Sequence, residues 1–151
     1  MEKELAVVND EERRYIMVKL GEEQYGIDIR YIDNIVRLQS ITRVPSVQSY
    51  FPGVINLRGE VVPVMSLRIR MGLPQDEMGH KTRIIIVKVT EGNIGVLVDE
   101  VINVVTVRSE DVEKVSHDVK NGVQTFISGV GKVENGLISL LDISTLIEEE
   151  A

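Results

Sequence analysis

The chain has 151 residues, a formal net charge of -7 at pH 7 and no cysteine. This length suits one ordinary domain or two small ones, the missing cysteines exclude a disulfide framework and a thiolate nucleophile, and the negative charge disfavours nucleic acid and anionic membranes as partners. No signal-peptide pattern and no apolar run of membrane-spanning length occurs in the sequence, so we expect a cytoplasmic protein without direct membrane insertion.

The first predicted elements are an acidic arm and a β-hairpin. Residues 1–12 contain five acidic side chains without a clear period, and we expect them to be flexible. Arg14–Leu20 is a predicted strand, Gly21–Gln24 a turn, and Tyr25–Ile29 the returning strand. Gly26 lies inside that second strand, where glycine usually marks a bulge or the close approach of another backbone.

An arginine-rich segment follows the first hairpin. Residues 30–70 contain six arginines and only two acidic residues, Asp33 and Glu60, which gives this segment a net charge of +4 in an acidic chain. Arginine forms bidentate bonds with carboxylates, so a basic belt of this kind favours a protein partner with acidic side chains. A simple solvated belt is the alternative.

The most informative stretch is a second predicted hairpin, with strands at Val54–Leu57 and Val61–Met65. Asn56 suits the first position of a type I turn, and Gly59 can adopt the left-handed conformation that follows such a turn. Arg58 is then expected at the tip of the hairpin, in water. The turn itself does not require a guanidinium there, so Arg58 is a candidate functional residue.

A short helix is predicted directly after this hairpin. Ser66 is a good N-cap, Leu67–Met71 has a helical pattern, and Gly72 stops it. The polar stretch Pro74–Lys81 is the expected connector between two halves of the chain.

The second half of the sequence repeats the first. Arg83–Val107 aligns without a gap with Arg14–Leu38, so that Gly95 matches the glycine in the first hairpin. Gly129–Ile143 aligns in the same way with Gly53–Leu67. We therefore expect both halves to use the same order of strands and short helices.

This repeat predicts a mainly β fold. We expect a single domain over residues 13–149, with repeats at about 13–72 and 82–149 that form two similar small barrels packed together. Whether the halves exchange strands stays open. Asp142 is the expected cap of a C-terminal helix from Ile143 to about Glu149, and Ser116–Gln124 is expected to be a long polar loop.

The sequence contains no motif typical of catalysis. It has no nucleophile elbow, dinucleotide fingerprint or complete phosphate loop, and His80 and His117 have no nearby partner at metal-ligand spacing. We expect no enzymatic activity, no cofactor and no metal. A barrel that binds a small ligand, or an enzyme whose site is assembled from distant residues, remains the alternative.

Three motifs in order resemble the CheW family of bacterial chemotaxis coupling proteins: Tyr25–Ile29 (Y-G-I-D-I), Gly53–Val64 (G-V-I-N-L-R-G-E-V-V-P-V) and Ile94–Asp99 (I-G-V-L-V-D). The likeness covers about residues 13–148. It implies two five-stranded, SH3-like β-barrel subdomains that share a core, and a non-enzymatic scaffold or adaptor for signal transduction through protein–protein interaction.

The resemblance also implies the partners of such an adaptor. These are the regulatory domain of the histidine kinase CheA, a two-component kinase, and the cytoplasmic tip of transmembrane methyl-accepting chemoreceptors, in arrays on the inner face of the membrane. A detached regulatory module of a larger kinase is the alternative within the same fold.

By position, Ile32, Asn34 and Arg58 fall where the family has residues that bind partners, chiefly the receptor. The family often has an acidic residue at the position of Asn34, which leaves the role of this asparagine open. We add Val36 and Leu57 to the same candidate site, although Ile32 and Val36 also fit core positions at helical spacing and Arg58 fits a solubilising turn residue. The residues expected to shape the backbone are Gly26, Gly53, Gly59 and Gly95.

Overall fold

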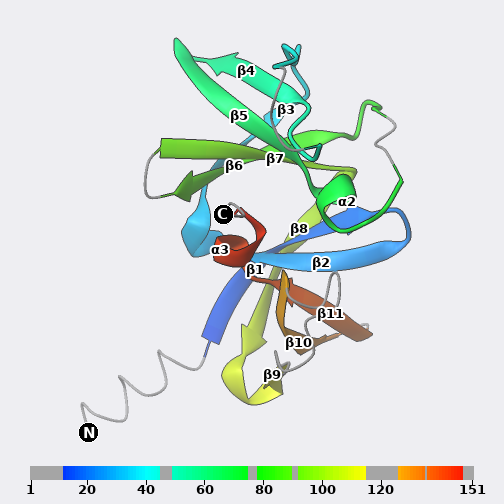
Figure 1. The fold of residues 1–151 in the computed structure, drawn as a ribbon. Coiled ribbons are helices and arrows are strands. Elements are labelled where there is room, and N and C mark those ends of the chain that lie inside the picture. The colour runs from blue at the N-terminus through cyan, green and yellow to red at the C-terminus, as the bar shows by residue number, and fades with distance from the viewer. Residues whose placement is uncertain are drawn as a thin grey trace, which may run out of the picture. The chain divides into compact units, whose positions relative to one another are not determined.

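The computed structural model describes residues 12–44, 49–74, 78–89, 92–114, 126–134 and 136–147, and the chain divides into two compact units (Figure 1). Unit 1 comprises residues 1–18, 24–29 and 102–151, and unit 2 comprises residues 19–23 and 30–101. Nearly all of the predicted acidic arm, the predicted loop at Ser116–Gln124 and the middle of the predicted connector lie outside the described residues.

The prediction of a mainly β fold with short helices is confirmed. The strands are β1 (Glu12–Leu20), β2 (Glu23–Asp28), β3 (Ile32–Arg37), β4 (Gly53–Leu57), β5 (Glu60–Ser66), β6 (Arg83–Val89), β7 (Gly92–Val98), β8 (Glu100–Arg108), β9 (Val112–Lys114), β10 (Ile127–Val133) and β11 (Gly136–Leu141). The helices are the 3₁₀ turns η1 (Ile29–Tyr31) and η2 (Ser109–Asp111) and the α-helices α2 (Leu67–Arg70) and α3 (Ile143–Leu146).

Unit 1 is built on a six-stranded sheet with the strand order β8-β1-β2-β11-β10-β9. Alternate positions of its strands are apolar, and one face buries a core of Met17, Ile138 and Leu140. Partly buried apolar side chains pack around this core. The period of two along each strand therefore supplies the core, as the pattern of the sequence predicts.

Unit 2 is built on a five-stranded sheet with the order β3-β6-β7-β5-β4. The sheet has the predicted number of strands, whereas unit 1 has one more because β9 pairs with β10 over three residues. Unit 2 has no strand that corresponds to β9 among its described residues. Thr42 instead forms an isolated bridge with Val54 of β4. The core contains Ile55, Val62, Val64, Ile84, Ile86 and Leu97.

Each sheet contains a parallel contact between strands that are far apart in the sequence. In unit 2, β5 runs parallel to β7 with Val64 opposite Gly95. In unit 1, β11 runs parallel to β2 with Leu140 opposite Gly26. A Cβ atom on Gly95 would lie 2.7 Å from Cγ2 of Ile84, and one on Gly26 would lie 3.1 Å from Cδ1 of Ile138. Glycine therefore leaves room for core side chains at both contacts.

The first hairpin is tighter than predicted. β1 ends at Leu20 and β2 begins at Glu23, so that the turn has two residues instead of four. Gly21 takes a φ of 61°, in the left-handed region. Glycine at that position makes the shorter turn accessible.

The predicted helix caps are confirmed. The hydroxyl of Ser66 accepts a hydrogen bond of 3.2 Å from the N–H of Ile69, and Asp142 accepts one of 3.4 Å from the N–H of Thr145. Gly72, with a φ of 81°, ends α2 one residue earlier than predicted. α3 ends at Leu146, and the last residues of the predicted C-terminal helix lie outside the described part of the chain.

A bidentate ion pair within unit 2 joins elements that are distant in sequence. Arg68 on α2 donates from Nε to Oδ1 of Asp99 at 2.9 Å and from Nη2 to Oδ2 at 2.8 Å. The N–H of Gly21 donates to the same carboxylate at 2.7 Å. Partial burial acts to raise the pKa of Asp99, but the hydrogen bonds from Arg68 and Gly21 outweigh it and hold that pKa below its ordinary value.

We expect Asp99→Asn to lower the free energy of unfolding by about 1–2 kcal/mol at neutral pH, because the charged hydrogen bonds are lost. The folded-state pKa of Asp99 is depressed, so its contribution is present above the unfolded-state value of about 4 and is lost as the pH falls through the folded-state value. Urea unfolding at several pH values measures this difference. Asp33→Asn on an exposed position of β3 is the matched control, and a loss that stays constant into the acid range would contradict the assignment.

Candidate partner-binding site

The hairpin of β4 and β5 has a different turn from the one predicted. Its two strands pair from Gly53 opposite Val64 to Leu57 opposite Glu60, which leaves only Arg58 and Gly59 in the loop. Their φ angles are 55° and 85°. Two successive positive φ angles define a type I′ turn, so the predicted type I turn is wrong and the left-handed Gly59 is confirmed.

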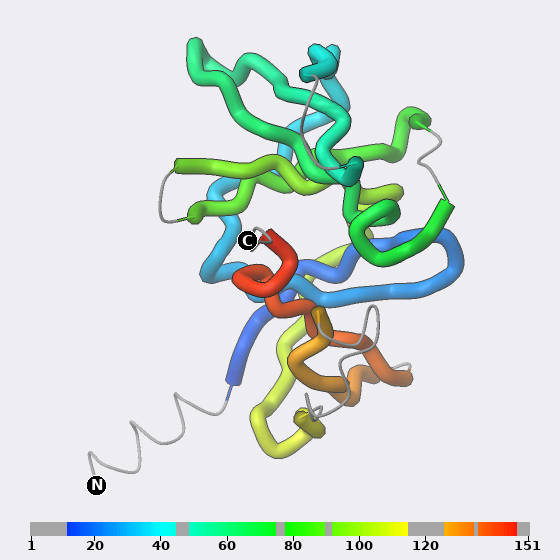
Figure 2. The backbone as a smooth tube through the Cα atoms, in the orientation of Figure 1, coloured from blue at the N-terminus to red at the C-terminus, as the bar shows by residue number. Residues whose placement is uncertain are grey.

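Asn56 has a different role in this turn from the one predicted. Its side-chain oxygen accepts a hydrogen bond of 3.1 Å from the N–H of Gly59. The asparagine thus stabilises the loop from the last part of β4 and does not itself form a turn position. The twist of a type I′ turn matches that of the flanking strands, and Figure 2 shows the two strands joined by a tight bend.

Arg58 is held in a conformation that side chains rarely adopt. It is the one residue other than glycine with a positive φ among the described residues, and this conformation costs about 1–2 kcal/mol. The side chain is exposed, and within the described part of the chain it makes no hydrogen bond or ion pair. No polar contact with a described residue therefore offsets the cost, which is a reason to look for a function outside the fold.

The two faces of the hairpin differ sharply in exposure. Ile55 and Val62 are 1% exposed and belong to the core of unit 2, and Leu57 is half-buried against it. Val61, which follows the tip, is 68% exposed. Val61 is thus a candidate contact residue that the sequence analysis missed, although the period of two along β5 already separates it from the buried Val62.

Gly53 allows another segment to approach the hairpin closely. Thr42 and Val54 exchange two backbone hydrogen bonds of 2.8 Å. A Cβ atom on Gly53 would overlap the carbonyl oxygen of Thr42 and lie 2.7 Å from its carbonyl carbon. The chain after β3 is thereby joined to β4, although β3 and β4 are opposite edges of the five-stranded sheet.

The residues predicted from the segment before this bridge lie on β3. Ile32, Asn34 and Val36 alternate with exposed residues and share one half-buried face of the strand. The helical spacing of Ile32 and Val36 is therefore wrong, because a strand has a period of two, but the alternative of a core position is confirmed for Val36. Val36 packs against the same core cluster as Leu57.

Asn34 has an unusual environment on this face. β3 has an irregular register against β6 between Ile32 and Asn34. The side-chain oxygen of Asn34 is buried and receives no hydrogen bond within the described residues. A buried acceptor without a donor costs about 1–3 kcal/mol, so Asn34 is held in its place at a cost, and its role stays a prediction.

The arginine-rich segment is not a uniform basic surface. Arg68 is held by Asp99, and the guanidinium of Arg70 lies 4.2 Å from the ring centroid of Tyr50 in a cation–π contact. The other four arginines, Arg30, Arg37, Arg43 and Arg58, are exposed. The charge available to an acidic partner is thus smaller than the sequence suggests.

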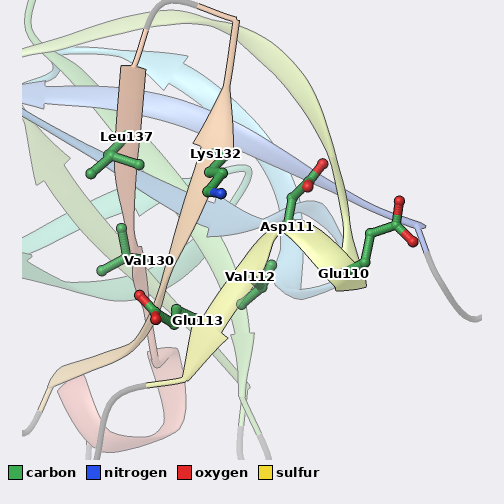
Figure 3. Close-up of a pocket in the computed structure, with 7 residues that line it drawn as sticks. All are labelled: Glu110, Asp111, Val112, Glu113, Val130, Lys132 and Leu137. Atoms are coloured by element: carbon green, nitrogen blue, oxygen red, sulfur yellow. The ribbon is translucent and has the colours of Figure 1, made fainter.

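An open pocket of about 330 Å³ in unit 1 offers a test of the ligand-binding alternative. Glu110, Asp111 and Glu113 line it together with Lys132 and three apolar side chains. Figure 3 shows the three carboxylates spread around the pocket instead of meeting at one point. Across the described ranges, no group of three or more histidine, cysteine or acidic residues is arranged to hold a metal ion.

None of the helices in the described part of the chain is both long enough and apolar enough to cross a membrane.

Comparisons with known proteins identify the family. The model of the CheW-like domain matches residues 14–151. The chain is 35% identical over 138 residues to the chemotaxis protein CheW of Bacillus subtilis, covering 91% of this chain and 88% of that protein. It is 31% identical over 147 residues to the chemotaxis protein CheW of Treponema pallidum, covering 95% and 86%.

A solved structure is also similar. The crystal structure of the scaffolding protein TtCheW from Thermoanaerobacter tengcongensis superposes with a TM-score of 0.82 at 30% sequence identity. The match covers 91% of this chain and 89% of that chain. The likeness therefore extends over both units.

We expect Gly53→Ala and Gly59→Ala to destabilise the protein for different reasons. At Gly53 the added methyl group collides with the backbone of Thr42, which should cost about 1–3 kcal/mol and accelerate amide hydrogen exchange at Thr42 and Val54. At Gly59 nothing lies within 4 Å, so the cost is the left-handed φ alone, about 1–2 kcal/mol, and these two amides should stay protected. Equal exchange in both variants would contradict the close-approach argument.

Proposed function

The chain belongs to the CheW-like domain family, as the match over residues 14–151 establishes, and we propose that it couples a CheA-type histidine kinase to the cytoplasmic tips of chemoreceptors. Its general role as an adaptor in chemotaxis signalling follows from the family. The proposal concerns the two partners and the residues that bind them. The match over nearly the whole chain is the observation that carries it.

The hairpin tip supports a receptor contact through its chemistry. Arg58 presents an exposed guanidinium beside the 68%-exposed Val61. Arginine next to exposed apolar surface is a common composition of binding hot spots, and a guanidinium binds carboxylates on a partner helix in a bidentate manner. We assign the tip to the receptor, and we keep Asn34 on β3 as a further candidate contact residue.

The remaining predicted residues support this site by packing between it and the core of unit 2. Val36 and Leu57 pack on the core of unit 2, and Ile32 shares the half-buried face of β3 with Val36. In the proposal they hold the strand and the hairpin in place and contribute apolar contact at the edge of the site. The kinase would use other surfaces of the protein.

This function requires no chemical step in the adaptor. A change of receptor state would alter how the adaptor and the kinase pack, and the kinase population would shift toward its active or inactive form. The site of action in this proposal is the cytoplasm, at receptor arrays on the inner face of the membrane.

Calorimetric titration of the chain with the regulatory domain of CheA from the same organism tests the coupling role. We expect binding at micromolar concentration or tighter, retained when a receptor tip fragment is added, and a three-part complex in size-exclusion chromatography. If a chain that melts cooperatively does not bind the kinase domain, the proposal fails. In that case the open pocket near Lys132 would be screened for small ligands.

Arg58→Asn separates the contribution of Arg58 to binding from its effect on the fold. Asn-Gly is the preferred pair for a type I′ turn, so we expect unfolding free energy to stay equal or to rise by up to about 1 kcal/mol. Affinity for a receptor tip fragment should fall about tenfold or more, as for a hot-spot residue. Arg43→Asn removes the same charge from another exposed position, and an equal loss of affinity in both variants would show a general charge effect instead of a site.

A further inference from the structure

The edge strands of the two sheets are protected to different degrees. Exposed strand edges pair readily with other chains, and proteins usually block them with charged residues, bulges, short strands or covering segments. β9 has only three residues, two of them charged, and β4 is bridged by Thr42. β3 carries Asp33 and Arg37 on its exposed side and a register irregularity against β6.

Within the described part of the chain, β8 is neither short nor charged in its interior, and no described segment is bridged to its outer edge. It is nine residues long and forms an edge of the sheet in unit 1. Its interior sequence, V-I-N-V-V-T-V, contains no charge, proline or glycine. Ile102 is 38% exposed and Val104 is 50% exposed, and Asn103 between them is exposed as well. Neighbours on a strand point to opposite faces, so this part of the edge is open on both sides.

The internal repeat shows which protection β8 lacks. In the sequence alignment of the two halves, Ile35 of β3 matches Val104 of β8. The charged residues on either side of Ile35 are Asp33 and Arg37, and β8 has Ile102 and Thr106 at the matching positions. The two charges that block the edge of unit 2 are thus replaced by an apolar residue and an uncharged residue.

We propose that β8 pairs with β8 of a second copy of the chain, antiparallel, about a two-fold axis at Val104. In this register Val104 of one copy faces Val104 of the other. Ile102 of each copy faces Thr106 of the other, and Glu100 of each copy faces Arg108 of the other. Paired residues lie on the same face of the joined sheet, because their numbers differ by an even amount. The apolar side chains at 102 and 104 of both copies then form one continuous stripe.

The charges at the ends of β8 make a second copy the favoured occupant. When two copies of β8 run antiparallel, Glu100 of each copy lies opposite Arg108 of the other. Opposite charges that face each other across strands stabilise the pair. Both groups already form ion pairs: the half-buried Glu100 with Lys81 at 3.9 Å, and the exposed Arg108 with Glu12 at 3.4 Å and with Glu110 at 3.2 Å. Such surface pairs are weak and rearrange easily, so they do not oppose the dimer.

The dimer is expected to be weak and dependent on concentration. One added strand pair buries far less than the roughly 1,200–2,000 Å² of a stable interface. Self-association of this kind does not depend on the proposed coupling function, and its test uses the purified chain alone. A failure of either proposal therefore leaves the other unaffected.

Disulfide cross-linking tests the register, since the chain has no cysteine of its own. Opposed residues of antiparallel strands have Cα atoms about 4.5–5.5 Å apart, within the range that a disulfide spans. Val104→Cys should therefore form a covalent dimer under mild oxidation. In Ile102→Cys the two thiols would be four residues apart along the strands, about 13 Å, and only a trace of dimer is expected. Equal cross-linking of both variants would overturn the register.

Sedimentation velocity from micromolar to millimolar concentration tests the dimer without oxidation. The unmodified chain should shift reversibly toward dimer, and Val104→Lys should weaken the association about tenfold or more, because two like charges would meet at the axis. Ile35→Lys makes a comparable change on β3 and should leave the association unchanged. A chain that stays monomeric throughout overturns the proposal. If Val104→Lys then weakens binding of the kinase regulatory domain, the edge takes a strand of that partner instead.

Discussion

Both sheets depend on a short parallel contact between strands from different halves of the sequence. Val64 pairs with Gly95 in unit 2, and Leu140 pairs with Gly26 in unit 1. The four positions correspond to one another in the repeat, so the same contact is used twice. Each core lies over such a junction, and neither repeat can complete a sheet from its own strands. The glycines matter because core side chains pack against the backbone at these points.

The candidate site follows from how unit 2 is closed. The bridge at Thr42 joins the chain after β3 to β4, and it fixes the base of the hairpin while the tip remains free to meet a partner. At the tip, a left-handed arginine stands where asparagine or glycine would be more stable. The fold thus tolerates a local cost at the position that the proposed function needs, as functional sites often do.

Local features were predictable from the sequence, and long-range ones were not. The hairpin of β4 and β5 and the caps Ser66 and Asp142 follow from neighbouring residues, and the structure confirms them. The turn type was predicted wrongly because asparagine fits two arrangements. It can be the first position of a type I turn, or it can accept a hydrogen bond from a shorter loop, as Asn56 does from Gly59. The pairing of Arg68 with Asp99 joins residues 31 positions apart, and sequence spacing carries no information about such a contact. The partner-binding residues came from a resemblance, and their roles stay predictions.

The distribution of the strands along the chain also sets the order in which the units can form on a ribosome. The strands of unit 2 lie between β3 and β7, so its sheet can assemble once the first two thirds of the chain have emerged. β2 must wait for β11 near the C-terminus, because Leu140 is its partner in the parallel contact. During synthesis we therefore expect the apolar face of β1 and β2 to stay uncovered until β11 has emerged, and a face of this kind is open to premature contacts with other chains.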